Sequence, residues 1–177
     1  MNIFITILLI LAVLVAVVFV VALFVKKDYV ISRDINVLTS RQKAFDYIRF
    51  LRNQDNYSKW VMVDPDMKKD FKGTDGTVGF VYRWDGNQKA GKGEQEIIGI
   101  NEGERIAVEL RFIKPFAGVA RAHMTTQVVN GDGTNIRWTM EGSNPYPRNL
   151  MNPLIGSILG KDLELSLSNL KSILENK

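Results

Sequence analysis

The chain of 177 residues has no cysteine and only one histidine, His123. It can therefore form no disulfide, thiolate metal site or cysteine nucleophile, and cysteine usage says nothing about its redox compartment. Ser143 lies outside any Gly-x-Ser-x-Gly motif, and His123 has no carboxylate at a recognisable spacing, so a serine triad is unsupported. His123 alternates with Arg121, Thr125 and Gln127, which indicates a solvent-facing strand rather than a general base.

Other signatures of cofactor and nucleic-acid binding are also missing. The net charge of +4 is modest and its basic residues are mixed with acidic ones, so we expect no nucleic-acid partner. Asp64-Pro-Asp66 lacks the other ligands of a calcium loop and indicates a turn. Gly91-x-Gly93 lacks the third glycine of a dinucleotide site. We predict no metal and no cofactor.

One long hydrophobic run is present. Every residue from Ile3 to Val25 is apolar except Thr6, and a helix of about 23 residues is long enough to cross a bilayer core of about 30 Å. Lys26 and Lys27 end the run, and Tyr29 follows at interfacial depth. The alternative is a cleaved signal peptide, but a basic n-region is lacking and the run is too long for one.

This run divides the chain into a transmembrane anchor, residues 1–27, and one domain, residues 28–177. Lys26, Lys27 and Arg33 follow the span, whereas only the α-amino group precedes it, so the positive-inside rule predicts a single-pass protein with its domain in the cytoplasm. The glycosylation sequon Asn56-Tyr-Ser58 would matter only on the opposite side. The sequence leaves the oligomeric state open.

The domain is predicted to be α+β. Apolar and polar side chains alternate over residues 29–37, as in a strand with one covered face. Thr39 with Gln42 has the form of a capping box for a short helix that ends near Asn53. Five further strands are expected at 78–84, 93–100, 105–112, 119–129 and 134–141. The short Gly- and Asn-rich turns between them, 130–133 included, permit only antiparallel neighbours.

A long C-terminal helix is expected after Pro147, with Asn152 as its cap and Pro153 at its first position. Its apolar face comprises Leu154, Ile158, Leu163, Leu167, Leu170 and Leu174. Laid across a twisted sheet, such a helix would enclose a cavity. Gly156, Gly160, Gly91 and Gly93 either shape that cavity or serve as packing positions.

Several segments, taken in order from Asp28 to Lys177, resemble the polyketide cyclase/dehydrase branch of the START-like (SRPBCC) superfamily. They are Ala44–Ile48, Asn56–Trp60, Val78–Trp84, Gly91–Gly93, Pro115-Phe116, Trp138–Gly142 and Leu170-Lys171. The resemblance implies a helix-grip fold, in which a curved antiparallel sheet wraps around the C-terminal helix and an apolar ligand lies between them. Because activities in this superfamily are diverse, it does not determine the chemistry.

Side chains expected to point under the helix are aromatic or flexible and apolar, as suits a hydrophobic ligand, although they could equally pack as core. These candidates for the cavity wall are Phe80, Tyr82, Trp84, Leu110, Phe112, Met124, Trp138 and Met140. Arg33 falls on the apolar face of the first strand, where it would either be a polar cavity residue or lie at the sheet rim in water.

The sequence thus favours a membrane-anchored binding or carrier module for a lipid or other hydrophobic small molecule. One alternative is a cyclase-like enzyme, for which Arg33, Tyr82 and Glu141 are the candidate polar residues. The other is a non-catalytic interaction module with a filled core.

Overall fold

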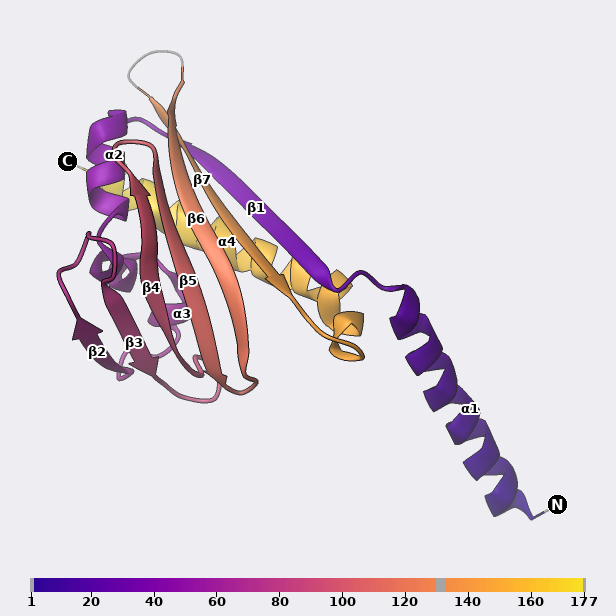
Figure 1. Ribbon diagram of the computed structural model, residues 1–177. Coiled ribbons are helices and arrows are strands. Elements are labelled where there is room, and N and C mark those ends of the chain that lie inside the picture. Colours follow the sequence, from indigo (N-terminus) through magenta and orange to yellow (C-terminus); the bar gives the residue numbers. More distant parts are fainter. Residues whose placement is uncertain (1, 130–132, 177) are drawn as a thin grey trace.

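The computed structural model describes residues 2–129 and 133–176. Helix α1 (Ile3–Phe24) buries only Ala22 and projects away from the rest of the chain (Figure 1). It is the single helix in these described ranges that is long and apolar enough to cross a membrane. An exposed apolar surface of this extent is unfavourable in water, which accords with the expected anchor.

The domain is built on one seven-stranded antiparallel sheet in the order β1-β7-β6-β5-β4-β3-β2. The strands are β1 (Asp28–Val37), β2 (Lys68–Lys72), β3 (Val81–Asp85), β4 (Lys92–Asn101), β5 (Arg105–Lys114), β6 (Gly118–Val128) and β7 (Thr134–Ser143). Neighbours from β2 to β7 follow chain order, which confirms the predicted antiparallel connections. Strand β1 forms the edge of the sheet opposite β2 and pairs with β7, with Arg33 opposite Trp138.

Two details of the sheet differ from expectation. Strand β3 begins at Val81 rather than Val78, because Gly79 has a φ of +88° and interrupts the extended backbone. Strand β2 was not predicted, since it carries charged residues around a single aromatic one, Phe71, and shows no apolar alternation. Such charged strands are common at sheet edges, where β2 lies. The predicted turn at 130–133 falls mostly outside the described residues.

Four short helical segments and one long helix complete the domain. They are α2 (Arg41–Ile48), the 3-10 turn η1 (Leu51–Asn56), α3 (Lys59–Met62), the 3-10 turn η2 (Arg148–Met151) and α4 (Asn152–Glu175). The predicted cap Thr39 was wrong by one residue, because the Ser40 side chain accepts the hydrogen bond from the Lys43 amide. The first helix ends at Ile48 rather than Asn53, and η1 follows it as a separate turn.

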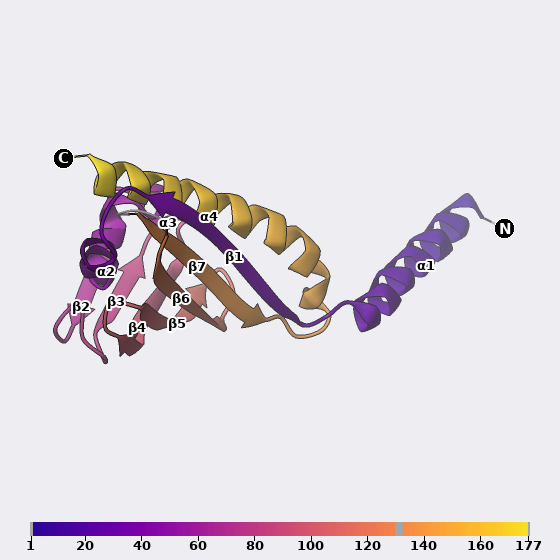
Figure 2. The same ribbon diagram turned by 90° about the horizontal axis from the view of Figure 1, so that it is seen from above.

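Helix α4 crosses the inner face of the sheet next to β1 (Figure 2). Leu163, Leu167, Leu170 and Leu174 are buried against the sheet. Leu154 and Ile158 were expected on the same face, but they are 57% and 60% exposed. The N-terminal half of α4 extends toward the anchor end of the domain (Figure 2), where only Ile155 and Leu159 pack against the core.

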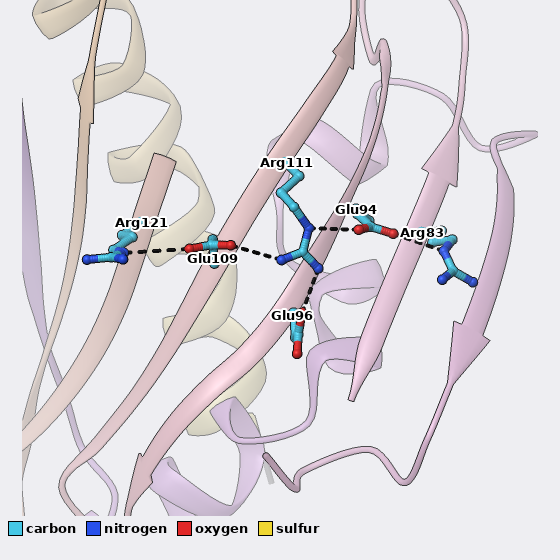
Figure 3. A network of polar contacts seen from close by, with 6 residues as sticks. All are labelled: Arg83, Glu94, Glu96, Glu109, Arg111 and Arg121. Atoms are coloured by element: carbon cyan, nitrogen blue, oxygen red, sulfur yellow. Dashed lines mark hydrogen bonds and ion pairs between the residues drawn. The ribbon is translucent and has the colours of Figure 1, made fainter. Parts of the chain in front are cut away.

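The outer face of the sheet carries an ion-pair network centred on Arg111 (Figure 3). Its guanidinium lies 2.7 Å from Glu94, 2.6 Å from Glu96 and 2.9 Å from Glu109. Arg83 and Arg121 extend the network at either side. Because side chains alternate across a strand, this charged surface leaves the intervening residues of β4 and β5 for the inner face.

Candidate ligand cavity

A cavity of about 140 Å³ lies between the inner face of the sheet, the η1–α3 segment and α4. Its wall is formed by Gln54, Ser58, Trp60, Val61, Met67, Tyr82, Trp84, Ala90, Gln95, Leu110, Phe112, Met140 and Leu159. This volume is close to the ~150 Å³ of a protein cavity that accepts one benzene ring. The predicted interior space therefore exists at the size of a ring or a short chain.

The polar side chains of the wall are buried and uncharged. Gln95 Nε2 donates a 2.9 Å hydrogen bond to Gln54 Oε1, and both residues are buried. Ser58 is 2% exposed. Gln54 Nε2, Gln95 Oε1 and Ser58 Oγ make no hydrogen bond to any residue that the structure describes, yet none of these atoms is completely enclosed. Three neutral hydrogen-bonding groups therefore remain free at this end of the cavity.

Tyr82 lies next to this polar end, and its hydroxyl donates a 2.8 Å hydrogen bond to Asp55. Lys69 lies 2.8 Å from the other Asp55 oxygen, so the carboxylate has a counter-charge. Burial, followed by the hydrogen bond and negative charge of Asp55, raises the pKa of Tyr82 above its ordinary value. The phenol consequently keeps its proton at neutral pH, and the wall carries no net charge.

The other end of the cavity is apolar and only half-buried. Trp84 and Phe112 meet edge to face at 6.0 Å between ring centroids. The Trp84 ring lies over Gly93, where an added Cβ would come within 2.6 Å of it. Gly93 is therefore a packing glycine that makes room for the indole. Trp60 and Leu159 contribute from α3 and α4.

Five of the eight predicted apolar candidates lie on the cavity wall, and their contact with a ligand remains a prediction. These are Tyr82, Trp84, Leu110, Phe112 and Met140. Phe80 does not line it, because it is stacked on Phe71 with ring centroids 6.2 Å apart. Met124 and Trp138 do not line it either, since the η1–α3 segment fills the space above them.

Two aromatic side chains of the η1–α3 segment, Tyr57 and Trp60, occupy the space above Met124 and Trp138. Tyr57 is fully buried and its hydroxyl contacts the Met124 sulfur at 3.8 Å. Trp60 and Tyr57 both pack edge-on against Trp138, with centroids 5.8 Å and 6.0 Å apart. A void of only about 10 Å³ remains beside Met124 and Trp138. The cavity is thus displaced toward β3, β4 and β5.

Arg33 lies at the sheet rim rather than in the cavity. Its side chain is 37% exposed and forms a 2.5 Å ion pair with Glu164 of α4. The guanidinium crosses the helix at Gly160, where a Cβ would overlap it. Gly160 is thus a packing glycine, and Arg33 joins β1 to α4.

Sequence reasoning missed the polar end of the cavity. Gln95 alternates with Glu94 and Glu96, so β4 shows no apolar face in this region. Gln54 lies in the 3-10 turn, outside any periodic pattern. The remaining wall residues that were missed are Ser58, Trp60, Val61, Met67, Ala90 and Leu159.

The other candidate reactive residues lie away from the cavity. His123 alternates with the buried Ala122 and Met124 on β6, and desolvation, followed by the charge of Arg105, lowers its pKa. Glu141 lines a shallow surface groove beside Tyr29 and Arg121. Within residues 2–129 and 133–176, no group of three or more His, Asp or Glu side chains is arranged to hold a metal ion.

Comparison with known proteins identifies the fold. No family model and no curated protein sequence matches the chain. Truncated norcoclaurine synthase from Thalictrum flavum superposes with a TM-score of 0.64 at 15% identity, covering 86% of this chain and 98% of that one. Another structure of that synthase, in complex with dopamine and hydroxybenzaldehyde, gives 0.63 at 14% identity, covering 89% and 94%.

Two further structures are of other proteins. The di-domain ARO/CYC protein StfQ of the steffimycin biosynthetic pathway gives a TM-score of 0.63 at 10% identity, covering 84% of this chain and 51% of StfQ. The Aha1 dimer from Colwellia psychrerythraea gives 0.58 at 14%, covering 83% and 96%. The domain therefore has the START-like helix-grip fold. At these identities the likeness establishes the fold alone.

Proposed function

We propose that this chain is a membrane-anchored binding or carrier module that holds a lipid or other hydrophobic small molecule between the sheet and α4. The cavity carries the proposal, because it is a space between the sheet and α4 that opens through a half-buried rim of Trp60, Trp84, Phe112 and Leu159. Trp84 and Phe112 are near the ends of β3 and β5, which lie at the same end of the antiparallel sheet as the start of β1, although β7, β6, β5 and β4 separate β3 from β1.

The attachment of α1 supports this arrangement. Asn149 Nδ2 donates hydrogen bonds to the carbonyl oxygens of Ala22 and Val25, at 2.6 and 2.7 Å. Asn152 was expected to cap α4, but its Nδ2 instead binds the carbonyls of Lys26 and Lys27, both at 2.8 Å. The anchor is thus fastened to the η2–α4 segment, which would hold the cavity close to the bilayer and raise the local concentration of membrane ligands.

The cavity size restricts what could be held. About 140 Å³ accommodates a ring or part of one chain, but not a whole two-chain lipid. The synthase complex named above binds dopamine and hydroxybenzaldehyde, which are single-ring molecules. An open interior also disfavours the filled interaction module. Lys26 and Lys27 after the span favour the cytoplasmic side for the domain.

A cyclase-like enzyme is the second candidate, and one observation favours it. Of its three candidate residues, only Tyr82 lies on the cavity wall, with Asp55 and Lys69 behind its hydroxyl. The raised pKa of Tyr82 keeps its hydroxyl protonated at neutral pH, so it is not a base, and because that proton is donated to Asp55 the oxygen can only accept a hydrogen bond from a ligand. This is a binding arrangement as much as a catalytic one, so we place the binding module first.

Photo-crosslinking tests the proposed function in the full chain in its native membrane. A diazirine side chain at Leu159, on the cavity wall, is compared with one at Leu165, which is 47% exposed on the same helix. We expect a defined small-molecule adduct at Leu159 and none at Leu165, identified by mass spectrometry. Identical bulk-lipid adducts at both positions, or no adduct at Leu159, would contradict the proposal.

A further inference from the structure

The polar side chains of the cavity wall are buried together with Met67 and Met140, whereas the rim of the cavity is apolar and half-buried. Gln54, Gln95 and Ser58 are each less than 9% exposed. The apolar end, formed by Trp60, Trp84, Phe112 and Leu159, is more open. An amphiphilic molecule that entered with its apolar part first would leave the remaining donor and acceptor of the paired amides, Gln54 Nε2 and Gln95 Oε1, without a partner, at a cost for each unsatisfied group.

No charge on the wall could balance a charged ligand. Tyr82 is the single ionisable residue among those that line the cavity, and it is neutral at pH 7 for the reasons given above. The carboxylate that contacts the wall through Tyr82, Asp55, is already engaged by Tyr82 and Lys69. Burying a carboxylate or an ammonium group here would therefore be costly, since neither would find a counter-charge.

The free atoms define the complementary chemistry. Gln54 Nε2 and Ser58 Oγ can donate, and Gln95 Oε1 and Ser58 Oγ can accept. If the Gln54 and Gln95 amides were both turned over, the pair would still present one free donor and one free acceptor. A hydroxyl or carbonyl oxygen on the ligand satisfies these groups, whereas a hydrocarbon does not.

We propose that the cavity binds the uncharged, oxygen-bearing head of a ring-sized or single-chain amphiphile, head first against Gln54, Gln95 and Ser58. The apolar remainder of the ligand points through the rim toward the anchor end of the domain. This inference rests on the proposed binding function and specifies its ligand class. It also reconciles the small cavity with a membrane ligand, because only the head needs to fit inside.

The test uses the full chain in lipid nanodiscs and four matched probes: cyclohexanol, methylcyclohexane, cyclohexanecarboxylate and cyclohexylammonium. These compounds are transparent where tryptophan absorbs, and Trp60 and Trp84 on the wall report occupancy through their emission. We expect cyclohexanol to bind at pH 7, and each charged probe to bind at least about 100-fold more weakly.

The variant Gln54→Leu with Gln95→Leu removes both amides together, which avoids leaving one partner unpaired. We expect the ratio of cyclohexanol to methylcyclohexane affinity to fall by about 10-fold, equivalent to the ~1.4 kcal/mol of one hydrogen bond. Ser58→Ala is a second, milder variant, since Ser58 makes no side-chain capping bond to α3. Gln127→Leu, on the exposed outer face, is the matched control.

The outcomes separate this inference from the proposed function. Binding of methylcyclohexane with an unchanged affinity ratio in both variants would overturn the head-first inference and leave the binding function intact. Tight binding of a charged probe would also overturn it. If no probe perturbed the tryptophan emission, the cavity would accept no ring-sized molecule, and both proposals would fail.

Discussion

The side-chain amide of Asn149 donates a 2.6 Å hydrogen bond to the carbonyl oxygen of Ala22, in the last turn of α1. Asn149 is 1% exposed, although it lies in a short 3-10 turn. The final carbonyls of a helix have no partner within the helix, so a buried amide supplies what the helix end lacks. The segment that joins anchor and domain is consequently fixed rather than a free tether.

Proteolysis of this segment provides the first prediction. Lys26 and Lys27 are trypsin sites whose carbonyls are bound by Asn152. Asn152→Asp keeps the shape and removes the donor, so the loss of two hydrogen bonds, about 1–2 kcal/mol, should promote local opening. We expect trypsin to cleave there about 5- to 10-fold faster. Asn101→Asp, on the exposed end of β4, is the control, and equal rates in both variants would refute the fixed attachment.

The second prediction concerns the glycine beneath Trp84. In Gly93→Ala the new Cβ would meet the indole and the Arg111 carbonyl, so the ring would be pushed toward the cavity. We expect a loss of about 1–3 kcal/mol, as for overpacked cores, and a melting temperature lower by roughly 3–8 °C in nanodiscs.

Gly99→Ala is the matched control for Gly93→Ala. It lies on the same strand, and its nearest neighbour, the Ala107 Cβ, is 3.9 Å from the added atom. A similar loss of stability in both variants would mean that strand conformation, rather than the Trp84 contact, requires Gly93.

Much of this fold could be predicted because its signals are local. Alternation and turn residues predicted β4 to β7 to within about two residues, and the leucines from Leu163 to Leu174 predicted the buried face of α4. The edge strand β2 was missed because charge, rather than alternation, suits an exposed edge. Leu154 and Ile158 were misplaced because periodicity does not reveal where the partner surface ends.

The cavity was less predictable because its wall depends on long-range contacts. Gln54 and Gln95 are 41 residues apart and meet only through the folding of η1 over the sheet. Trp138 has the inward orientation that alternation predicts, but Trp60 and Tyr57 cover it. Sequence patterns show which side chains face inward. They do not show which of these inward-facing side chains will be covered by another segment of the chain.

The third prediction is a pH dependence centred on Arg111. The hydrogen bond from Arg111, followed by that from Arg83, lowers the pKa of Glu94 below its unfolded value of 4.5. The resulting stabilisation is therefore present above pH 4.5 and is lost as the pH falls through the lower, folded-state pKa. We expect Arg111→Met to lower the melting temperature by about 2–4 °C at pH 7, and this difference should shrink at acidic pH.

Thermal unfolding of both chains across a pH series measures this effect. Arg137→Met is the control, because among the residues that the structure describes Arg137 forms one ion pair, a 3.7 Å contact with Asp34. A difference between wild type and Arg111→Met that stayed constant below pH 4.5 would show that the Glu94 carboxylate does not carry the stabilisation.

The two glycines of α4 give the last prediction, because they lie one turn apart in different surroundings. At Gly156 an added Cβ meets no atom within 4 Å, so Gly156→Ala should gain about 0.8–1 kcal/mol of helix propensity. At Gly160 the same atom would displace the Arg33 guanidinium and its contact with Glu164. We therefore expect Gly160→Ala to be neutral or destabilising.

Arg33→Ala combined with Gly160→Ala should recover the gain, with a coupling of at least about 0.5 kcal/mol in a double-mutant cycle of unfolding free energies. Strict additivity of the two substitutions would show instead that Gly160 is not there to accommodate Arg33.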